Sequence, residues 1–269
     1  MHKEFYDGAT PEMLAVKSNS RVLTLIPGNF RESDEHNVVV GLHQPPSGEN
    51  VSEFMRYFED RYSNLGKTNQ IIAIATAHHR LAYIHPFLDG NGRVCRLMSH
   101  AMALHAGIGI HGIWSISRGL ARGLEGSGEY KRRMSLADSP RKGDLDGRGN
   151  LSLSELKDFT NWFLKLCLDQ IDFMSTLFDM DNLKGRLEHY VSCKGLKLES
   201  FRVIKAVLRD GEIARGDAEE LTGFKERQAR TILSSLTNDG ILGSDSPKGA
   251  VSLRFSVDSS RILFPKLFE

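Results

Sequence analysis

Residues 85–96 read HPFLDGNGRVCR, a stretch that puts a proline directly after a histidine and two glycines around an asparagine. A residue before proline disfavours helical backbone, so the apolar helix predicted over residues 68–84 is expected to end at His85. A second helix is expected over residues 93–107, where the apolar spacing resumes. The stretch therefore predicts a tight turn between two helices.

The same turn carries groups that bind phosphate. Gly90 and Gly92 let the backbone approach a ligand closely. The helix that follows presents free N–H groups and a partial positive charge at its N-terminus, which suits an anion. Arg93 and Arg96 add charge-assisted donors three residues apart on the first helical turn. We therefore expect a cradle for nucleotide phosphates.

Two further side chains suit a reaction at the bound phosphates. Asp89 supplies a carboxylate that can hold a Mg²⁺ ion bridging phosphates. His85 lies at the end of a rigid helix and can act as a general base. The set predicts in-line attack of a hydroxyl on a phosphorus atom. A simple helix–turn–helix connection that contains a histidine is the competing interpretation, and any single residue would favour it; the combined pattern favours the site.

The rest of the chain predicts a mostly α protein. Two regions are expected: residues 1–195, which hold the turn, and residues 196–269. The second region contains three helical patterns and then two apolar runs around SDSPKG, which is typical of a winged helix-turn-helix. Further helices are expected over residues 51–65, 154–178 and 182–195.

The stretch HPFLDGNGRVCR matches the Fic-domain signature HPFx(D/E)GNGRxxR at every fixed position, and the chain resembles the Fic family over most of its length. The resemblance implies a Fic-type helical bundle with a small β-hairpin flap. The flap corresponds to VVVGLHQPP, residues 38–46, which would pair with an extended segment of a target protein and place its side chain over His85.

The resemblance also implies an activity. Fic proteins mostly transfer AMP from ATP to a Ser, Thr or Tyr hydroxyl of a target protein, which can be the enzyme itself, and release pyrophosphate. By resemblance His85 is the base and Asp89 binds Mg²⁺ between the α- and β-phosphates. The phosphate-binding residues would be an anion hole of Gly90, Asn91 and Gly92, with Arg93 and Arg96 on the β- and γ-phosphates.

Two other functions stay open at this point. The reverse reaction, which removes AMP from a modified protein, uses the same motif. A DNA-binding regulator with a nucleotide-sensing Fic domain is the alternative from another class. Lys225, Arg227, Gln228 and Arg230 suit DNA contacts, but residues 196–269 hold 12 basic and 11 acidic side chains, a weak basic balance for DNA. Protein contact through the winged helix is an equal expectation.

Composition sets the remaining expectations. Lys plus Arg is 35 and Asp plus Glu is 34, so the net charge of +1 draws the chain to neither nucleic acid nor an anionic membrane. Three cysteines without CxxC spacing indicate thiols in a reducing compartment. The N-terminus has no signal-peptide pattern and no apolar run spans a bilayer. We expect a soluble, cytoplasmic protein without membrane contact.

Two segments resemble sites but depart from their patterns. DLDGRGNLSLSE, residues 144–155, follows an EF-hand loop except for the positive charge of Arg148, so no calcium site is expected. Many Fic enzymes carry an inhibitory [S/T]xxxE[G/N] helix whose glutamate pairs with the second arginine of the motif. Glu49 and Glu125 have the right ending, yet Pro45 and Ala121 stand where Ser or Thr belongs. Arg96 is therefore expected to be free for the γ-phosphate.

Overall fold

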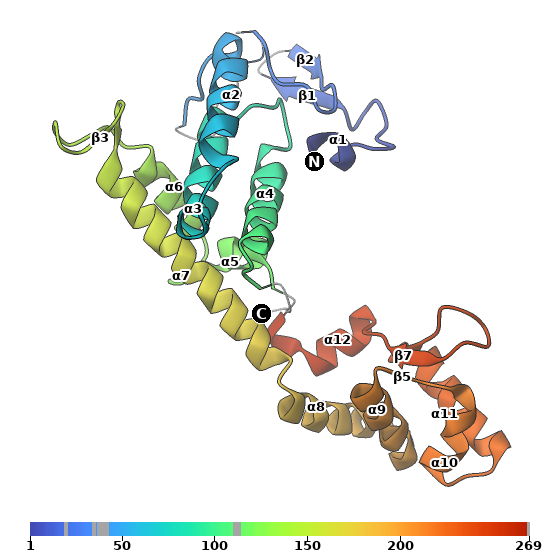
Figure 1. Cartoon of the computed structure of the whole chain (residues 1–269). Coiled ribbons are helices and arrows are strands. Elements are labelled where there is room, and N and C mark those ends of the chain that lie inside the picture. Colours follow the sequence, from blue (N-terminus) through green and yellow to red (C-terminus); the bar gives the residue numbers. More distant parts are fainter. Residues whose placement is uncertain (19–20, 34–35, 37–42, 110–113, 268–269) are drawn as a thin grey trace. The chain divides into compact units, whose positions relative to one another are not determined.

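The computed structural model describes residues 1–18, 21–33, 36, 43–109 and 114–267, and most of its regular structure is helical (Figure 1). The expected mostly α fold class is confirmed. Contacts divide the chain into two compact units, Met1–Met174 and Ser175–Glu269. This division falls inside one long helix, α7 (Leu153–Leu177). The domain boundary expected at 195/196 lies further along the chain and stays a prediction.

Three helices form the centre of the first unit: α2 (Val51–Tyr62), α3 (Lys67–Ile84) and α4 (Asn91–His105). All three were predicted from apolar spacing. α3 packs between the other two (Figure 1), and it is buried because small and apolar side chains recur along it. α7 covers another side of α3, where the Phe163 ring lies 4.9 Å from the His78 ring.

Shorter elements surround these helices. β1 (Ala15–Ser18) pairs antiparallel with β2 (Arg21–Thr24), a hairpin that the sequence pattern did not predict because each strand has only four residues. Residues 37–42, the centre of the predicted flap, lie outside the described residues. The remaining elements of this unit are α1 (His2–Phe5), η2 (Gly48–Asn50), α5 (Ile116–Arg122), α6 (Glu129–Ala137), β3 (Gly147–Arg148) and β4 (Leu151–Ser152).

In the loop that resembles an EF-hand, the carboxylates accept hydrogen bonds and an ion pair from groups of the loop and of the residues beside it. Asp146 accepts hydrogen bonds from the main-chain N–H of Ser154 (2.7 Å) and of Lys142 (3.0 Å). The Glu155 carboxylate pairs with the Lys142 ammonium. These carboxylates shape the loop, and in the described part of the chain no cluster of three His, Cys, Asp or Glu side chains is placed to hold a metal ion.

The second unit contains the predicted helices and hairpin. Its three-stranded antiparallel sheet has the order β5-β7-β6, so one strand joins the predicted hairpin. The interpretation of this region as a winged helix-turn-helix stays a prediction. The elements are α8 (Met180–Cys193), α9 (Leu198–Asp210), β5 (Glu212–Ile213), η3 (Arg215–Asp217), α10 (Ala218–Thr222), α11 (Glu226–Asn238), β6 (Leu242–Gly243), β7 (Val251–Leu253), α12 (Val257–Leu263) and η4 (Pro265–Leu267).

Among the described residues, no helix is both long enough and apolar enough to cross a membrane.

Candidate active site

His85 has an unusual backbone conformation. As predicted, α3 ends at Ile84, and His85 caps it in the left-handed region with φ 49° and ψ 61°. Among the described residues it is the one non-glycine residue with positive φ. Such a conformation costs about 1–3 kcal/mol and persists only where neighbouring groups hold it. The residues that hold His85 are therefore part of the site.

Arg31 is the residue that holds it. Its side chain is buried, with 1% exposed. Nε donates to the His85 carbonyl (2.7 Å) and Nη2 donates to the Ile84 carbonyl (3.0 Å) and to that of Pro46. The main-chain N–H of Arg31 donates to the Pro86 carbonyl (2.8 Å). One guanidinium thus satisfies the last carbonyls of α3 and fixes the turn into the motif.

We expect Arg31→Met to destabilise the fold by roughly 3–5 kcal/mol, because it leaves several buried carbonyls without a donor. Urea unfolding followed by circular dichroism measures the loss. Arg56→Met, on the exposed side of α2, is the matched control and should stay within about 0.5 kcal/mol of the wild type. Equal stabilities of the two variants would show that Arg31 does not support this turn.

The N-terminus of α4 lies where the phosphate cradle is predicted. Gly90 caps the helix with φ 81°, and the first intrahelical bond runs from the Val94 N–H to the Gly90 carbonyl (3.0 Å). The N–H groups of residues 91–93 precede that bond and point toward the start of the helix. The Asn91 amide is buried and bonds both main-chain groups of Phe87 (2.9 and 2.7 Å). Asn91 therefore closes the loop with its side chain and has only its N–H to offer an anion.

Arg96 lies beside this helix start. A Cβ added at Gly92 would sit 3.1 Å from Nη1 of Arg96, so the guanidinium passes directly over the glycine. No carboxylate of the described residues forms an ion pair with Arg96. The expectation that Arg96 is free for the γ-phosphate stays a prediction.

Asp89 and Arg93 meet at the other edge of the cradle. Asp89 Oδ2 accepts from Arg93 Nη2 (3.0 Å) and from the Tyr6 hydroxyl (2.9 Å). Burial raises the pKa of Asp89, but bonds from the Gly90 N–H and Tyr6 outweigh it and bring the pKa below its ordinary value. Asp89 is consequently ionised at neutral pH and presents a hard oxygen ligand.

His85 is uncharged under the same conditions. Burial lowers its pKa to about 4, and the neighbouring His43 and Arg31 act in the same direction. A hydrogen bond with the Ala82 main chain acts against them. A neutral imidazole has one nitrogen with a free lone pair, which is what a general base requires.

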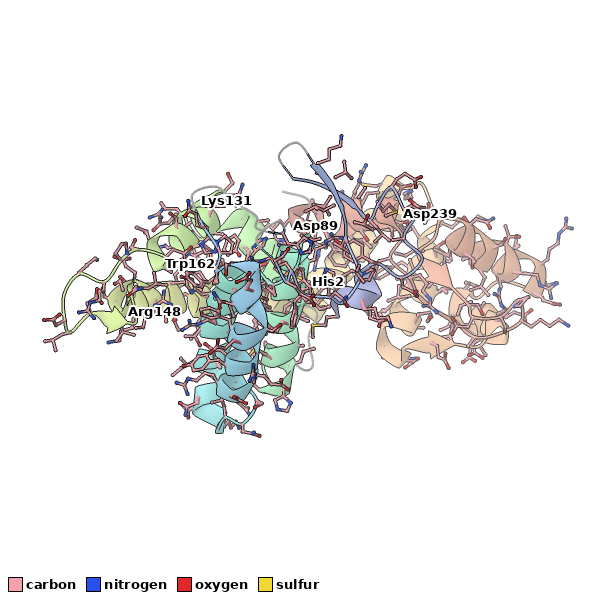
Figure 2. All side chains as sticks on the ribbon, turned by 90° about the horizontal axis from the view of Figure 1, so that it is seen from above. His2, Asp89, Lys131, Arg148, Trp162 and Asp239 are labelled. Carbon is pink, nitrogen blue, oxygen red and sulfur yellow. The ribbon has the colours of Figure 1, made fainter. Side chains whose placement is uncertain are left out.

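The sequence analysis missed three residues at this site: His2, Tyr6 and Arg31. Figure 2 shows His2 beside Asp89, whose carbonyl accepts from His2 Nε2 (3.0 Å). These residues lie 54 to 87 positions from their partners in the chain, and no local pattern marks them. Only the buried arginine, a rare residue type in a core, stands out once burial is known.

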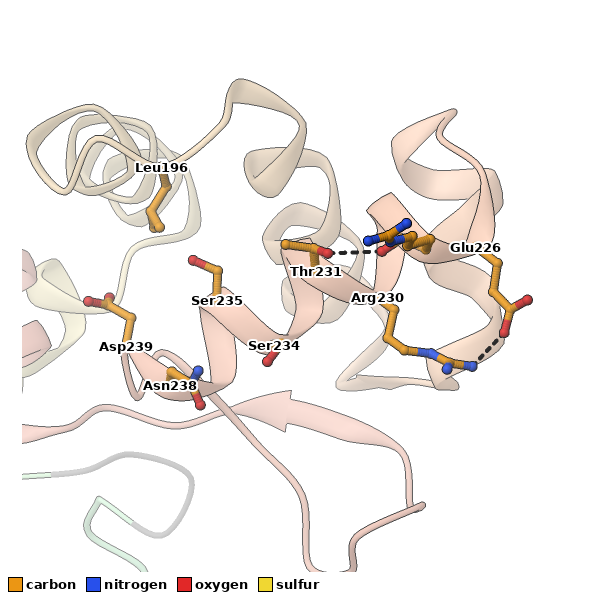
Figure 3. Close-up of a pocket in the computed structure, with 9 residues that line it drawn as sticks. Leu196, Glu226, Arg230, Thr231, Ser234, Ser235, Asn238 and Asp239 are labelled. Carbon is orange, nitrogen blue, oxygen red and sulfur yellow. Dashed lines mark hydrogen bonds and ion pairs between the residues drawn. The ribbon is translucent and has the colours of Figure 1, made fainter.

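A second surface lies on α11 in the other unit. Ala229, Ile232, Leu233 and Leu236 are buried there. The opposite face is polar and exposed, and it borders a hollow of about 880 Å³ together with Leu196 (Figure 3). A second hollow of about 890 Å³ reaches Arg215 and Lys248. The exposed face consists of Arg227, Arg230, Thr231, Ser234, Ser235 and Asn238. Glu226, which pairs with Arg230, and Asp239 line the same hollow.

Comparison with known proteins adds a family and relatives. Residues 10–103 match the model of the Fic/DOC family. The protein adenylyltransferase Fic of Drosophila willistoni is 38% identical over 84 residues, and that of Nematostella vectensis is 38% identical over 84 residues. The matched stretch covers 30% of this chain but only 16% and 18% of those relatives.

One solved structure resembles the chain over most of its length. It is a Fic family protein from Desulfovibrio desulfuricans G20 with 18% sequence identity and a TM-score of 0.44. The match covers 95% of this chain and 67% of that protein. Similarity at this level adds nothing to the contacts described above.

Proposed function

Because residues 10–103 form a domain of the Fic/DOC family, we propose that this protein is an adenylyltransferase that moves AMP from ATP to a hydroxyl group of a protein. The observation that supports it best is the juxtaposition of an uncharged histidine with a helix N-terminus. His85, at the end of α3, and the cradle at Gly90–Arg93 are joined by a turn that Arg31 and Asn91 hold rigidly. Relatives named protein adenylyltransferase Fic support the choice of reaction.

The proposed step conserves atoms and charge. The target hydroxyl oxygen attacks the α-phosphorus of ATP, and the bond from that phosphorus to the β-phosphate oxygen breaks. AMP stays on the protein and pyrophosphate leaves. The hydroxyl proton passes to His85. Because the imidazole is uncharged, one of its nitrogens has the lone pair that receives this proton.

The cradle residues stabilise the charge on the phosphates. The N–H groups of Asn91, Gly92 and Arg93 are available at the start of α4, where the helix dipole adds a partial positive charge. Arg96, which lies over Gly92, would bind the γ-phosphate, and Arg93 the β-phosphate. These donors are fixed before the substrate arrives, which is how preorganised sites lower a barrier.

Asp89 is the residue that fits a Mg²⁺ ion. Its carboxylate is ionised, its side chain is 58% exposed, and magnesium prefers a few carboxylate oxygens together with phosphate oxygens and water. Asp89 would hold the ion, which would supply positive charge that stabilises the phosphates. The chain's contribution is to hold this carboxylate beside the phosphate cradle.

Incubation with ATP and Mg²⁺ tests the proposal. ATP labelled in the α-phosphate should transfer label to the protein itself or to proteins of a lysate, without an activating substitution because Arg96 has no glutamate partner among the described residues. ATP labelled in the γ-phosphate should transfer none. Label from the γ-position would indicate a kinase instead. Failure of both labels, with release of AMP from a premodified protein, would favour the reverse reaction.

We propose a second function, DNA binding, for the exposed face of α11. The sequence between Arg227 and Asn238 contains no acidic residue. Its side chains are arginine, serine, threonine and asparagine types, which contact phosphates and base edges. The hollow along this helix (Figure 3) and a second one that shares Arg230, Ser234 and Asn238 with it leave this face accessible.

Reversing the charge of Arg227 and Arg230 together should lower the affinity for duplex DNA by about tenfold or more at low salt, since each lost phosphate contact also lowers the salt slope by about 1. A gel shift across a salt series measures both. Arg202→Glu with Lys205→Glu on α9 makes the same change of charge and is the control. If the wild type fails to bind a duplex at low salt, the face is a protein-contact surface.

A further inference from the structure

The N-terminal segment, residues 1–6, lies on the motif loop. The His2 ring stacks on Phe87 with centroids 3.8 Å apart. Its Nδ1 accepts from the Gly28 N–H (2.9 Å), so the proton is on Nε2, which donates to the Asp89 carbonyl (3.0 Å). Two of these three contacts, to Phe87 and Asp89, fix α1 against the turn. This attachment places Tyr6 at the edge of the phosphate cradle.

Tyr6 closes a three-way contact with Asp89 and Arg93. Its hydroxyl accepts from Arg93 Nη2 (2.7 Å), because a guanidinium only donates. Its single proton must then point to Asp89 Oδ2 (2.9 Å). Arg93 Nη2 donates to the same Oδ2 (3.0 Å). Every hydrogen-bond direction in this cluster is therefore determined.

The three side chains differ sharply in exposure. Tyr6 is 7% exposed, whereas the Asp89 and Arg93 side chains are 58% and 44% exposed. An exposed ion pair restrains two flexible side chains only weakly. The buried ring supplies the fixed point that the pair lacks. Oδ2 accepts from both the Tyr6 hydroxyl and Arg93.

The glycine next to Asp89 shows how close this contact is. A Cβ at Gly90 would lie 3.0 Å from the Tyr6 hydroxyl and 3.4 Å from His2 Nε2. The N-terminal segment therefore covers the loop that caps α4. A larger residue at Gly90 would push Tyr6 away from Asp89 even if the loop kept its shape.

We propose that Tyr6 is a positioning residue of the nucleotide site, whose hydroxyl orients the Asp89 carboxylate for Mg²⁺. The proposal rests on the function proposed above. In this proposal Tyr6 does not contact the phosphates of ATP. It acts only through Asp89. Arg93 keeps its place without the hydroxyl, because its guanidinium also lies 5.0 Å from the centre of the Tyr6 ring and 5.8 Å from that of Phe5.

The test is calorimetric binding of ATP in excess Mg²⁺ and in EDTA, in a His85→Ala background so that no nucleotide is consumed. Tyr6→Phe removes only the hydroxyl. We expect its Kd for ATP in EDTA to match the parent within about twofold, while the enhancement by Mg²⁺ falls by about tenfold, the effect of one hydrogen bond to a charged group. Tyr57→Phe, an exposed tyrosine on α2, is the control and should change neither value.

Three outcomes would overturn the inference. In the first, Mg²⁺ strengthens ATP binding by the parent, and it strengthens binding by Tyr6→Phe to the same extent. That result would remove Tyr6 from the site and leave the proposed function intact. A parent without any Mg²⁺ enhancement would defeat both proposals. Equal losses with and without Mg²⁺, in Tyr6→Phe and also in Tyr6→Met, would show that the ring only supports the fold.

Discussion

His85→Ala is expected to lower adenylylation by a factor on the order of 10² to 10⁴, the usual contribution of a general base. ATP binding should be nearly unchanged, because the phosphate donors belong to α4 and its cap. Rates with α-labelled ATP and a calorimetric Kd measure the two effects separately. His105→Ala, an exposed histidine at the end of α4, is the control. Unchanged transfer by His85→Ala would remove this residue from the mechanism.

The same base sets the acid limb of the pH profile. Burial holds the pKa of His85 near 4, so the imidazole is neutral above that value and protonated below it. Activity should stay level as pH falls from 7 to 5 and should drop as it passes 4. An ordinary histidine would lose activity near 6.5. The direction follows because only the uncharged form accepts a proton.

The second large effect is expected for Asp89→Ala. Loss of the carboxylate should abolish the Mg²⁺ enhancement of ATP binding and lower transfer by roughly 10³, since a bound metal contributes several kcal/mol of charge stabilisation. Titration of ATP with and without Mg²⁺, alongside the labelling rate, measures both losses. Asp60→Ala on the exposed side of α2 is the control. A mutant with full Mg²⁺ enhancement would show that another group holds the metal.

Local sequence patterns were sufficient for the helices and the turn. Pro86 ends α3 where the steric rule places its end, and Gly90 and Gly92 mark the start of α4. The left-handed backbone of His85 was not predictable. Its cause is Arg31, which is 54 residues away in the chain, and such a pairing leaves no local trace.

The role of Asn91 shows a similar limit. From the motif, its amide appeared to belong with the groups that bind phosphate. In the structure both ends of the amide bond Phe87, so the residue type is explained by loop closure. Tyr6 shows the converse: a residue in an unremarkable N-terminal stretch lies against Asp89, because the tertiary fold brings α1 to the motif.

Arg31 also has a consequence for how the proposed activity could diversify. Its main chain bonds Pro86, and its side chain bonds both His85 and Pro46. Arg31 and Pro46, which flank residues 32–45 in the sequence, are therefore fixed to each other and to the motif. Lengthening a loop whose ends are fixed costs little, about 0.6 kcal/mol for each doubling of its length. Under the proposed function, segments from other proteins could be grafted between Arg31 and Pro46 to change the choice of target while His85 keeps its position.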